Sequence, residues 1–349
     1  MNNPAAQFED ISLLEAKLKT TQLPAELLQK ANAMVQRLTR LAQSTEYSQE
    51  YDLVARYLDW VVNIPWVKKS EDNLSLVNAK KILDTNHFGL ENIKERILEY
   101  ISVLSLKKSA NQKAKAPSFL FLGLVGTGKT TMAYSVAQAL GRQFGRIPMG
   151  GMGDALQLRG RAKTYPDAEP GQIMKVLRRA ETKNPVILLD EIDRITDEAK
   201  ADIMGVLVEL LDPEQNNSFL DHFIDYPFDL SEVLFITTAN NTTGIATAVM
   251  DRMEIIELPT YTDEQKIIIG KNYLMPRALT AAGLTPADLE ISENVWPLIT
   301  RPLGFDAGMR TLERTINTIC RKVAKSKIEG KVAKVQITDA NMKLYLPSW

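Results

Sequence analysis

The sequence predicts an α/β fold in which a parallel β-sheet is covered by helices on both faces, with helical segments before and after it. Three observations support this prediction. Short apolar runs alternate with helix-length segments between residues 119 and 258, a glycine-rich loop directly follows the first of these runs, and the strand pattern fades after Pro259. Such alternation is typical of βαβ units, whose strands run parallel and are buried on both faces.

Composition limits the size and the partners of the protein. A chain of 349 residues predicts roughly two domains at about 150 residues each, and 45% apolar residues suffice to bury their cores. Lys and Arg number 42 against 43 Asp and Glu. The net charge of −1 therefore gives no long-range field that would favour nucleic acid or an anionic membrane as a partner.

Cysteine content and hydrophobicity indicate the compartment. Cys320 is the single cysteine, which excludes an intrachain disulfide, and with only two histidines the chain lacks the ligands of a structural zinc site. The first twenty residues lack the basic and apolar regions of a secretory signal, and no apolar run approaches the about 20 residues of a membrane helix. We expect a soluble protein with no membrane partner, in the cytoplasm or another reducing interior such as the mitochondrial matrix.

The N-terminal segment predicts a helical arm, which we place at residues 1–70. Between Pro24 and Trp66 the apolar residues recur every three or four positions, and a polar break at 43–49 divides the run. Pro24 suits a first helical turn, and Pro65 ends the pattern. The simplest interpretation is a packed subdomain without chemistry of its own.

The central part, residues 71–260, carries the alternating pattern, and a polar connection at 107–116 precedes its first strand. The predicted strands are 119–122, 186–189, 233–237 and 255–258, and the predicted helices are 130–141, 172–182 and 199–211. Beyond Pro259 the spacing predicts helices over 263–279 and 308–329. Residues 261–349 therefore predict a mainly helical second domain.

A glycine-rich loop after the first predicted strand carries the most specific motif. It reads Gly123, Leu124, Val125, Gly126, Thr127, Gly128, Lys129 and Thr130, which fits the pattern GxxxxGK[ST], and Thr131 follows it into the predicted helix. Glycines let backbone N–H groups curl around phosphates, and the helix N-terminus adds positive potential. Lys129 can then reach the β- and γ-phosphate oxygens, and Thr130 can offer its hydroxyl to Mg²⁺. The loop predicts a binding site for ATP or ADP.

Two carboxylates follow the next buried strand. Asp190 and Glu191 come directly after the apolar run 186–189. In a parallel sheet the carboxyl ends of the strands are where ligands bind. We expect Asp190 to hold Mg²⁺ through its water shell and Glu191 to align the attacking water, because phosphoryl transfer depends on positioning and charge neutralisation.

Two further polar residues stand at strand ends. Asn240 follows the run 236–239, where its amide can sense the γ-phosphate or orient the same water, although Asn is also a common turn former. Arg252 precedes the strand 255–258. It is either a solvated surface residue or a finger that reaches the γ-phosphate of a neighbouring subunit and stabilises transition-state charge.

In this order the four motifs resemble those of the AAA+ ATPases, and they are most similar to those of the Lon ATP-dependent proteases. The resemblance runs from about Leu27 to Leu346. It rests on the strings YLDW at 57–60, IPW at 64–66, HFGL at 87–90, KERILEY at 94–100, DPEQN at 212–216, PFDLS at 227–231, FITTAN at 235–240 and DRME at 251–254. It implies an AAA+ P-loop NTPase with an N-terminal helical arm and a C-terminal helical lid.

The resemblance implies a role for each motif. Residues 123–130 would be the Walker A loop, Asp190 and Glu191 the Walker B pair, Asn240 sensor 1, Arg252 the arginine finger, and Arg310 the sensor 2 residue that the lid carries. It also places His87, Phe88 and Gly89 beside the adenine, with Tyr273 on the lid side. For His87, a packed or helix-capping histidine remains the alternative, because adenine is often held by backbone groups.

Members of this family form hexameric rings in which ATP hydrolysis drives aromatic pore loops that pull unfolded polypeptide inward. The resemblance therefore implies a homohexamer or open ring that acts on unfolded protein substrates. The first pore loop matches only in part: Tyr165 keeps the aromatic residue, whereas Pro166 and Asp167 replace the usual aliphatic residue and glycine. Pro166 stiffens the backbone, and Asp167 adds charge where the resemblance implies an apolar grip on the substrate, so the loop supports threading less firmly than the other motifs support ATP binding.

Lon proteases also carry a C-terminal peptidase domain with a Ser–Lys dyad. The sequence ends at Trp349, where that domain would begin, and contains no serine motif of that kind. We expect either an excised ATPase segment of a full protease or a free-standing relative, with any peptidase supplied separately.

The leading hypothesis is a Mg²⁺-dependent ATPase that forms a ring and unfolds or translocates proteins, normally feeding proteolysis. One alternative is an ATP-switched scaffold or chaperone-like remodeller that hydrolyses little ATP. Another is a nucleic-acid-binding AAA+ machine, which the balanced charge and the lack of an appended DNA-binding module disfavour. Weak DNA binding is nevertheless compatible with the resemblance.

Overall fold

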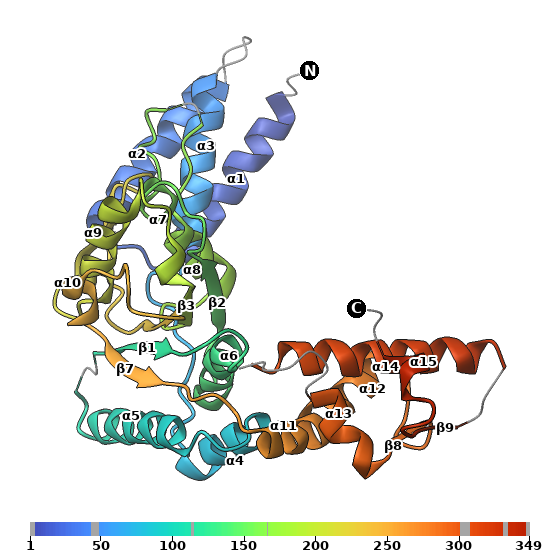
Figure 1. The fold of residues 1–349 in the computed structure, drawn as a ribbon. Coiled ribbons are helices and arrows are strands. Elements are labelled where there is room, and N and C mark those ends of the chain that lie inside the picture. Colours follow the sequence, from blue (N-terminus) through green and yellow to red (C-terminus); the bar gives the residue numbers. More distant parts are fainter. Residues whose placement is uncertain are drawn as a thin grey trace.

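The computed structural model describes residues 4–42, 49–112, 115–165, 167–300, 308–330 and 334–346. A five-stranded sheet forms the centre of the molecule (Figure 1). In spatial order its strands are β2 (Phe144–Pro148), β3 (Val186–Asp190), β6 (Leu234–Ala239), β1 (Ser118–Leu122) and β7 (Glu254–Glu257). All neighbouring strands pair in parallel, so all five end at the same edge. The predicted α/β fold is confirmed.

The side chains of the central strands are buried on both faces of the sheet. In β3, Val186 and Leu188 belong to one apolar cluster, whereas Ile187 and Leu189 belong to the cluster on the opposite face. All four are fully buried. Because successive residues of a strand point to opposite faces, two-sided burial makes such a strand a continuous apolar run in the sequence.

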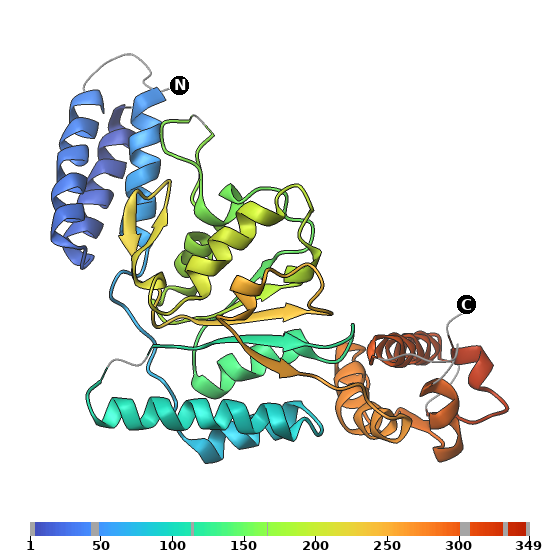
Figure 2. The same ribbon diagram turned by 60° about the vertical axis from the view of Figure 1, so that its left-hand side comes forward.

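Helices cover both faces, as Figure 2 shows. On one face lie α4 (Leu76–Asn86), α5 (Glu91–Ser109) and α6 (Lys129–Leu140). The other face carries α8 (Gln172–Ala180) and α9 (Lys200–Leu211), together with the short helices α7 (Leu156–Arg159) and α10 (Thr247–Met250). This layering leaves the carboxyl edge of the sheet open for a site.

Three helices form the N-terminal arm: α1 (Pro4–Thr20), α2 (Ala25–Ala42) and α3 (Gln49–Asn63). The base of the arm packs on a hairpin made of β4 (Phe219–Asp221) and β5 (Tyr226–Phe228). The Tyr57 hydroxyl donates a hydrogen bond to the carbonyl of Ile224 at 3.0 Å, and the Trp66 ring packs on Tyr226 and Phe228. The arm is thus joined to the α/β part by a continuous apolar cluster.

The elements after β7 form a separate unit, which we call the lid. Its helices are α11 (Asp263–Ile269), α12 (Met275–Ala281), α13 (Trp296–Thr300), α14 (Arg310–Ile328) and α15 (Met342–Tyr345). They enclose an apolar core of their own. A capping box at Thr262 and Gln265 begins α11, and a π-helical turn, Gly270–Leu274, joins it to α12.

Three features differ from the expectations drawn from the sequence. Strand β2 was not predicted, because Gly145 and Arg146 interrupt its apolar pattern. The lid contains a parallel pair, β8 (Leu289–Ile291) and β9 (Val335–Ile337), whose strands are too short to give a periodic signal. Helix α5 also extends into the expected connection at 107–116, with Lys107 and Lys108 in its last turn, where cations stabilise a helix.

The division of the chain at residues 70 and 260 stays a prediction. Within the described ranges, no helix combines the length and the apolar composition that crossing a membrane requires.

Candidate functional site

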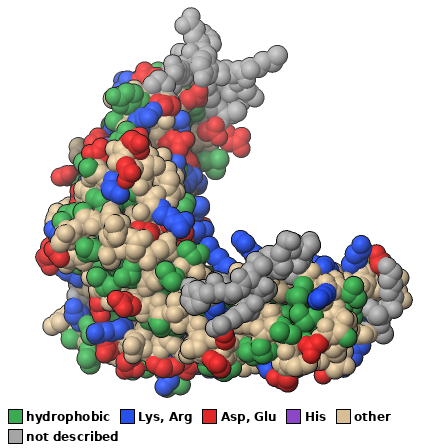
Figure 3. All heavy atoms as spheres, in the orientation of Figure 1, with side chains coloured by type: hydrophobic (Ala, Val, Ile, Leu, Met, Phe, Trp, Pro, Cys, Tyr) green, Lys and Arg blue, Asp and Glu red, His purple; other side chains and the backbone are tan. Residues whose placement is uncertain are grey.

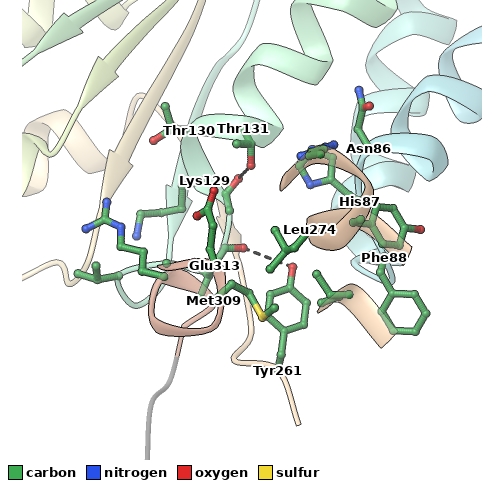
Figure 4. A pocket seen from close by; sticks show the side chains of 18 of the residues that line it. Asn86, His87, Phe88, Lys129, Thr130, Thr131, Tyr261, Leu274, Met309 and Glu313 are labelled. Atoms are coloured by element: carbon green, nitrogen blue, oxygen red, sulfur yellow. Dashed lines mark hydrogen bonds between the residues drawn. The ribbon is translucent and has the colours of Figure 1, made fainter. Parts of the chain in front are cut away.

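A cavity lies between the carboxyl edge of the sheet and the lid. Its walls come from the end of α4, the glycine-rich loop, the ends of β3 and β6, strand β2, and the lid (Figure 4). The lining residues are Asn86, His87, Phe88, Val125, Gly126, Thr127, Gly128, Lys129, Thr130, Thr131, Arg146, Asp190, Glu191, Asn240, Tyr261, Ile269, Tyr273, Leu274, Arg277, Met309, Arg310 and Glu313. Seen as spheres, the molecule is hollowed between the α/β part and the lid, and Lys and Arg side chains gather on the wall formed by the α/β part (Figure 3).

The glycine-rich loop curls back before α6 begins. Gly126 and Gly128 have φ values of 85° and 95°, which glycine adopts without strain. Lys129, the first residue of α6, donates from Nζ to the carbonyls of Gly123 at 2.5 Å and Leu124 at 3.0 Å. Burial lowers the pKa of Lys129. The nearby carboxylates of Asp193, Asp190 and Glu191 raise it and so offset part of this decrease.

Asp190 and Glu191 are held by the neighbouring strand β6. Oδ1 of Asp190 accepts a hydrogen bond from the Thr238 hydroxyl at 2.5 Å, and Oδ2 accepts one from Arg146 Nε at 2.8 Å. Nη2 of Arg146 completes the ion pair, 2.6 Å from Oδ2. The same Thr238 oxygen accepts from the backbone N–H of Glu191 at 2.8 Å. Glu191 has a positive φ of 62°, a conformation that costs free energy in a non-glycine residue and is concentrated at functional sites.

Asn240 faces the cavity rather than its own turn. Its side-chain oxygen accepts a hydrogen bond from Lys129 Nζ at 3.0 Å, and its backbone N–H donates to Oδ2 of Asp193 at 3.0 Å. The neighbouring Asn241 makes the local turn bond instead, by accepting from the N–H of Thr243 at 3.0 Å.

His87 lies at the opposite end of the cavity, where it ends α4 and its ring packs beside α6. Its backbone N–H donates to the carbonyl of Leu83 and ends α4, and its ring nitrogen Nε2 lies 2.9 Å from the Ser135 hydroxyl. Burial, with smaller contributions from Arg277 and Lys94, lowers the pKa of His87 to about 4 despite a raising backbone hydrogen bond. His87 is therefore neutral at pH 7.

Of the other residues predicted to lie beside the adenine, some line the cavity and one does not. Phe88 packs against the lid core, and the Tyr273 hydroxyl donates to the carbonyl of Asp84 at 3.1 Å. Both residues line the cavity, whereas Gly89 does not. Gly89 instead supplies a positive φ of 63° at the turn before α5. Gly123 and Leu124 also lie outside the lining and contribute only the carbonyls that Lys129 contacts.

The lid touches the glycine-rich loop directly. The backbone N–H of Met309 donates to the carbonyl of Gly126 at 3.0 Å, and the Tyr261 hydroxyl donates to that of Thr127 at 3.4 Å. Arg310, the first residue of α14, extends into the same cavity. The loop, the strand ends and the lid thus form a single site.

Comparison with known proteins agrees with this arrangement. Residues 119–260 match the model of the ATPase family associated with various cellular activities (AAA), and residues 280–336 match that of the Lon protease AAA+ ATPase lid domain. Lon protease from Lawsonia intracellularis is 43% identical over 338 residues, which are 97% of this chain and 40% of the relative. That from Dictyoglomus thermophilum is also 43% identical, over 97% of this chain and 42% of the relative.

The chain carries an AAA ATPase domain followed by a Lon-type AAA+ lid domain, and this pair is similar to the ATPase part of Lon proteases. It is an ATP-binding hydrolase of the AAA+ type. The chain spans about 40% of the length of the curated Lon proteases that it matches.

Two of the residues that the Lon resemblance singled out lie away from the cavity. Arg252 follows α10, where its Nε donates to Oδ2 of Asp212 at 3.2 Å and its Nη1 to the carbonyl of Ala248 at 2.6 Å. Tyr165, in the loop between α7 and α8, is 56% exposed. Pro166, the other predicted pore-loop residue, lies outside the described residues.

The residues available for a metal ion suit magnesium. Thr130 and Asp190 both line the cavity and offer one hydroxyl and one carboxylate. Mg²⁺ prefers such a sparse set of oxygen ligands completed by phosphates and water, rather than a protein cage. The described part of the chain contains no group of three or more His, Cys, Asp or Glu residues that could hold a metal ion.

Several lining residues were not predicted from the sequence. Among them, Arg146, Tyr261, Arg277 and Glu313 carry polar groups into the cavity. The spacing could have indicated Glu313, because it lies three residues after Arg310 and shares its face of α14. No local signal indicates Arg146, which lies within a strand that the apolar pattern did not reveal.

Proposed function

We propose that this chain hydrolyses ATP with Mg²⁺ in a ring of identical subunits and uses the energy to unfold and translocate polypeptides for proteolysis. One observation carries the proposal: Lys129 of α6, Asp190 and Glu191 at the end of β3, Asn240 at the end of β6 and Arg310 of α14 border one cavity. A scaffold that only binds ATP would need the glycine-rich loop, but not the strained carboxylate at Glu191.

Nucleotide binding would use groups that the free chain already presents. The backbone N–H groups of the loop and the N-terminus of α6 would hold the phosphates. Lys129 would exchange its contacts with two loop carbonyls and Asn240 for the β- and γ-phosphate oxygens. The apolar side chains of Phe88, Ile269 and Leu274 would enclose the base, beside a neutral His87.

Thr130 and Asp190 would hold Mg²⁺, which when bound neutralises the phosphate oxygens and favours phosphoryl transfer. Glu191 would orient the attacking water and accept its proton, since the carboxylate lines the cavity beside Asn240. Asn240 would fix the same water or the γ-phosphate. Arg310 would bind the phosphates from the lid side. Loss of the γ-phosphate would then change the position of the lid, which also contacts the loop through the Met309–Gly126 hydrogen bond.

Arg252 would act on the nucleotide of the adjacent subunit. Its guanidinium is held by Asp212 and does not reach the cavity of its own chain. Such an arginine finger accelerates hydrolysis by about 10³- to 10⁵-fold in other nucleotide hydrolases. A homohexamer or open ring would complete each site, and Tyr165, on an exposed loop, would contact the polypeptide.

The environment that we propose is the cytoplasm. The single cysteine, Cys320, is buried in the lid, and burial raises the pKa of its thiol to about 11. Such a thiol is unreactive, and as a free cysteine it is compatible with a reducing compartment.

The test measures phosphate release and nucleotide affinity for Glu191→Gln and Arg252→Ala. Glu191→Gln is expected to slow turnover at least about 100-fold while the affinity for ADP stays within about threefold, because the substitution removes the base and keeps the cavity. Glu198→Gln makes the same change at an exposed position of the next turn and should leave turnover unchanged.

Arg252→Ala is expected to slow turnover only under conditions where the wild-type chain is oligomeric, and wild-type turnover per chain should rise with chain concentration. Arg179→Ala, at an exposed position of α8, is the matched control. If neither Glu191→Gln nor Arg252→Ala slows hydrolysis, the assigned roles are wrong. Tight ATP binding without phosphate release by the oligomer would favour a scaffold instead.

A further inference from the structure

Arg146 forms an ion pair with Asp190 inside the cavity. It lies in β2, which pairs with β3 so that Pro148 is opposite Asp190. Nε of Arg146 donates a hydrogen bond to one carboxylate oxygen, Oδ2, at 2.8 Å, and Nη2 lies 2.6 Å from the same oxygen. Arg146 also lines the cavity together with the glycine-rich loop, so its charge faces the space that phosphates would fill.

The two oxygens of Asp190 are bound in different ways. Oδ1 accepts from Thr238, whose buried hydroxyl also accepts the N–H of Glu191, so this oxygen is tied to the framework of the sheet. Oδ2 is held only by Arg146 among the hydrogen bonds of the described residues. Oδ2 is therefore the oxygen that an ion or its water shell could reach.

The two partners also differ in exposure. The Asp190 side chain is 6% exposed, whereas that of Arg146 is 54% exposed. An ion pair with one solvated partner contributes little free energy, so the guanidinium can leave while the carboxylate stays in place. Replacing the ion pair at Oδ2 with the water shell of a divalent cation leaves the carboxylate neutralised in both states.

We propose that Arg146 is a positioning residue that occupies the Oδ2 oxygen of Asp190 in the nucleotide-free chain and leaves that oxygen when Mg²⁺ takes its place. The inference rests on the proposed function of the cavity. In the absence of Mg²⁺ the guanidinium supplies part of the positive charge that a bound nucleotide needs. With Mg²⁺ present, the ion must displace Arg146 from Asp190. Arg146 therefore sets how strongly nucleotide affinity depends on Mg²⁺.

The experiment measures the dissociation constant of a fluorescent N-methylanthraniloyl ADP for the full chain, once with excess Mg²⁺ and once with EDTA. Because ADP is not hydrolysed, the result does not depend on turnover. Without Mg²⁺, Arg146→Gln removes the cation that neutralises Asp190 near the nucleotide. With Mg²⁺, it removes the group that competes with the ion for Oδ2 of Asp190. The ratio of the EDTA constant to the Mg²⁺ constant is expected to rise by about three- to tenfold.

Arg194→Gln is the matched control. The Arg194 side chain is 52% exposed, and its Nη1 lies 3.6 Å from Oε2 of Glu191, the residue that follows β3. Arg194 is not among the residues that line the cavity. Its substitution removes the same charge and should leave the ratio within twofold. Arg146→Lys keeps a cation with fewer donors and should give a ratio between those of wild type and Arg146→Gln, which also carries the test if the glutamine variant does not fold.

The outcomes separate the inference from the proposed function. If the wild-type chain binds the ADP probe and Arg146→Gln leaves the ratio unchanged or lowers it, the inference is wrong and the proposed function stands. If the wild-type chain does not bind the probe even with Mg²⁺, both are wrong. If the ratio rises equally in Arg194→Gln, the effect comes from the loss of one positive charge and not from the contact with Asp190. That result would also overturn the inference.

Discussion

The contact between lid and glycine-rich loop can be tested by adding one methyl group. Gly308 packs so closely on the loop that a Cβ there would lie 2.3 Å from the carbonyl oxygen of Val125 and 3.0 Å from Cα of Gly126. Gly308→Ala therefore introduces a clash between the lid and the loop. An ordinary contact requires about 3.5 Å, so lid and loop must separate by about 1 Å.

The magnitude follows from what that separation removes. The Met309–Gly126 hydrogen bond, worth about 1 kcal/mol, is lost, and nucleotide affinity is expected to fall by about five- to tenfold. Arg310, the next residue, is misplaced by a similar distance, and a misplacement of about 1 Å in a catalytic group can slow turnover by about 100-fold. Both effects arise between the lid and the α/β part, so the unfolding of either part should change little.

The assays are titration with fluorescent ADP, phosphate release and thermal unfolding. Gly205→Ala is the control, because a Cβ at this position of α9 meets nothing within 4 Å. It should leave affinity and turnover unchanged and stabilise the chain by up to about 1 kcal/mol. Wild-type affinity and turnover in Gly308→Ala would show that the docked lid is not the active arrangement.

Two further predictions concern His87 and Asp212. Because the pKa of His87 is about 4 in the folded chain and about 6.5 in an unfolded one, stability should fall by about 2 kcal/mol from about pH 7.5 to about pH 5 on its account. Urea unfolding should show that His87→Gln removes this loss, and an unaltered pH dependence would contradict the burial argument. Asp212→Ala frees Arg252 and should lower kcat by about three- to tenfold without changing ADP affinity, whereas Asp212→Asn, which keeps an acceptor, should retain most activity. A change confined to KM would contradict a positioning role for Asp212.

Elements that depend on neighbouring residues were predictable from the sequence. The run 119–122 and the loop after it give a strand, a glycine turn and a helix in direct succession, and each is fixed by residues close in the chain. Strand β3 was predicted within one residue because burial on both faces requires unbroken apolar side chains. The family resemblance rests on the same contiguous strings.

Strand β2 shows where local reasoning fails. It lies at the edge of the sheet, and Gly145 is required because a Cβ there would lie 2.2 Å from the Val176 side chain of α8. The neighbouring Arg146 is tolerated because its charge meets Asp190 beyond the sheet edge. The sequence does not show either requirement, because one depends on α8 and the other on β3.

The sequence by itself determined the α/β fold, the phosphate-binding loop and the paired carboxylates, since each is set by side chains adjacent in the chain. Only the tertiary structure decided which oxygen of Asp190 is accessible, that Gly308 seals the lid against the loop, and that Arg252 faces away from its own cavity. These features depend on contacts between residues about 40 to 180 positions apart in the chain, and such contacts follow from the packing of whole elements.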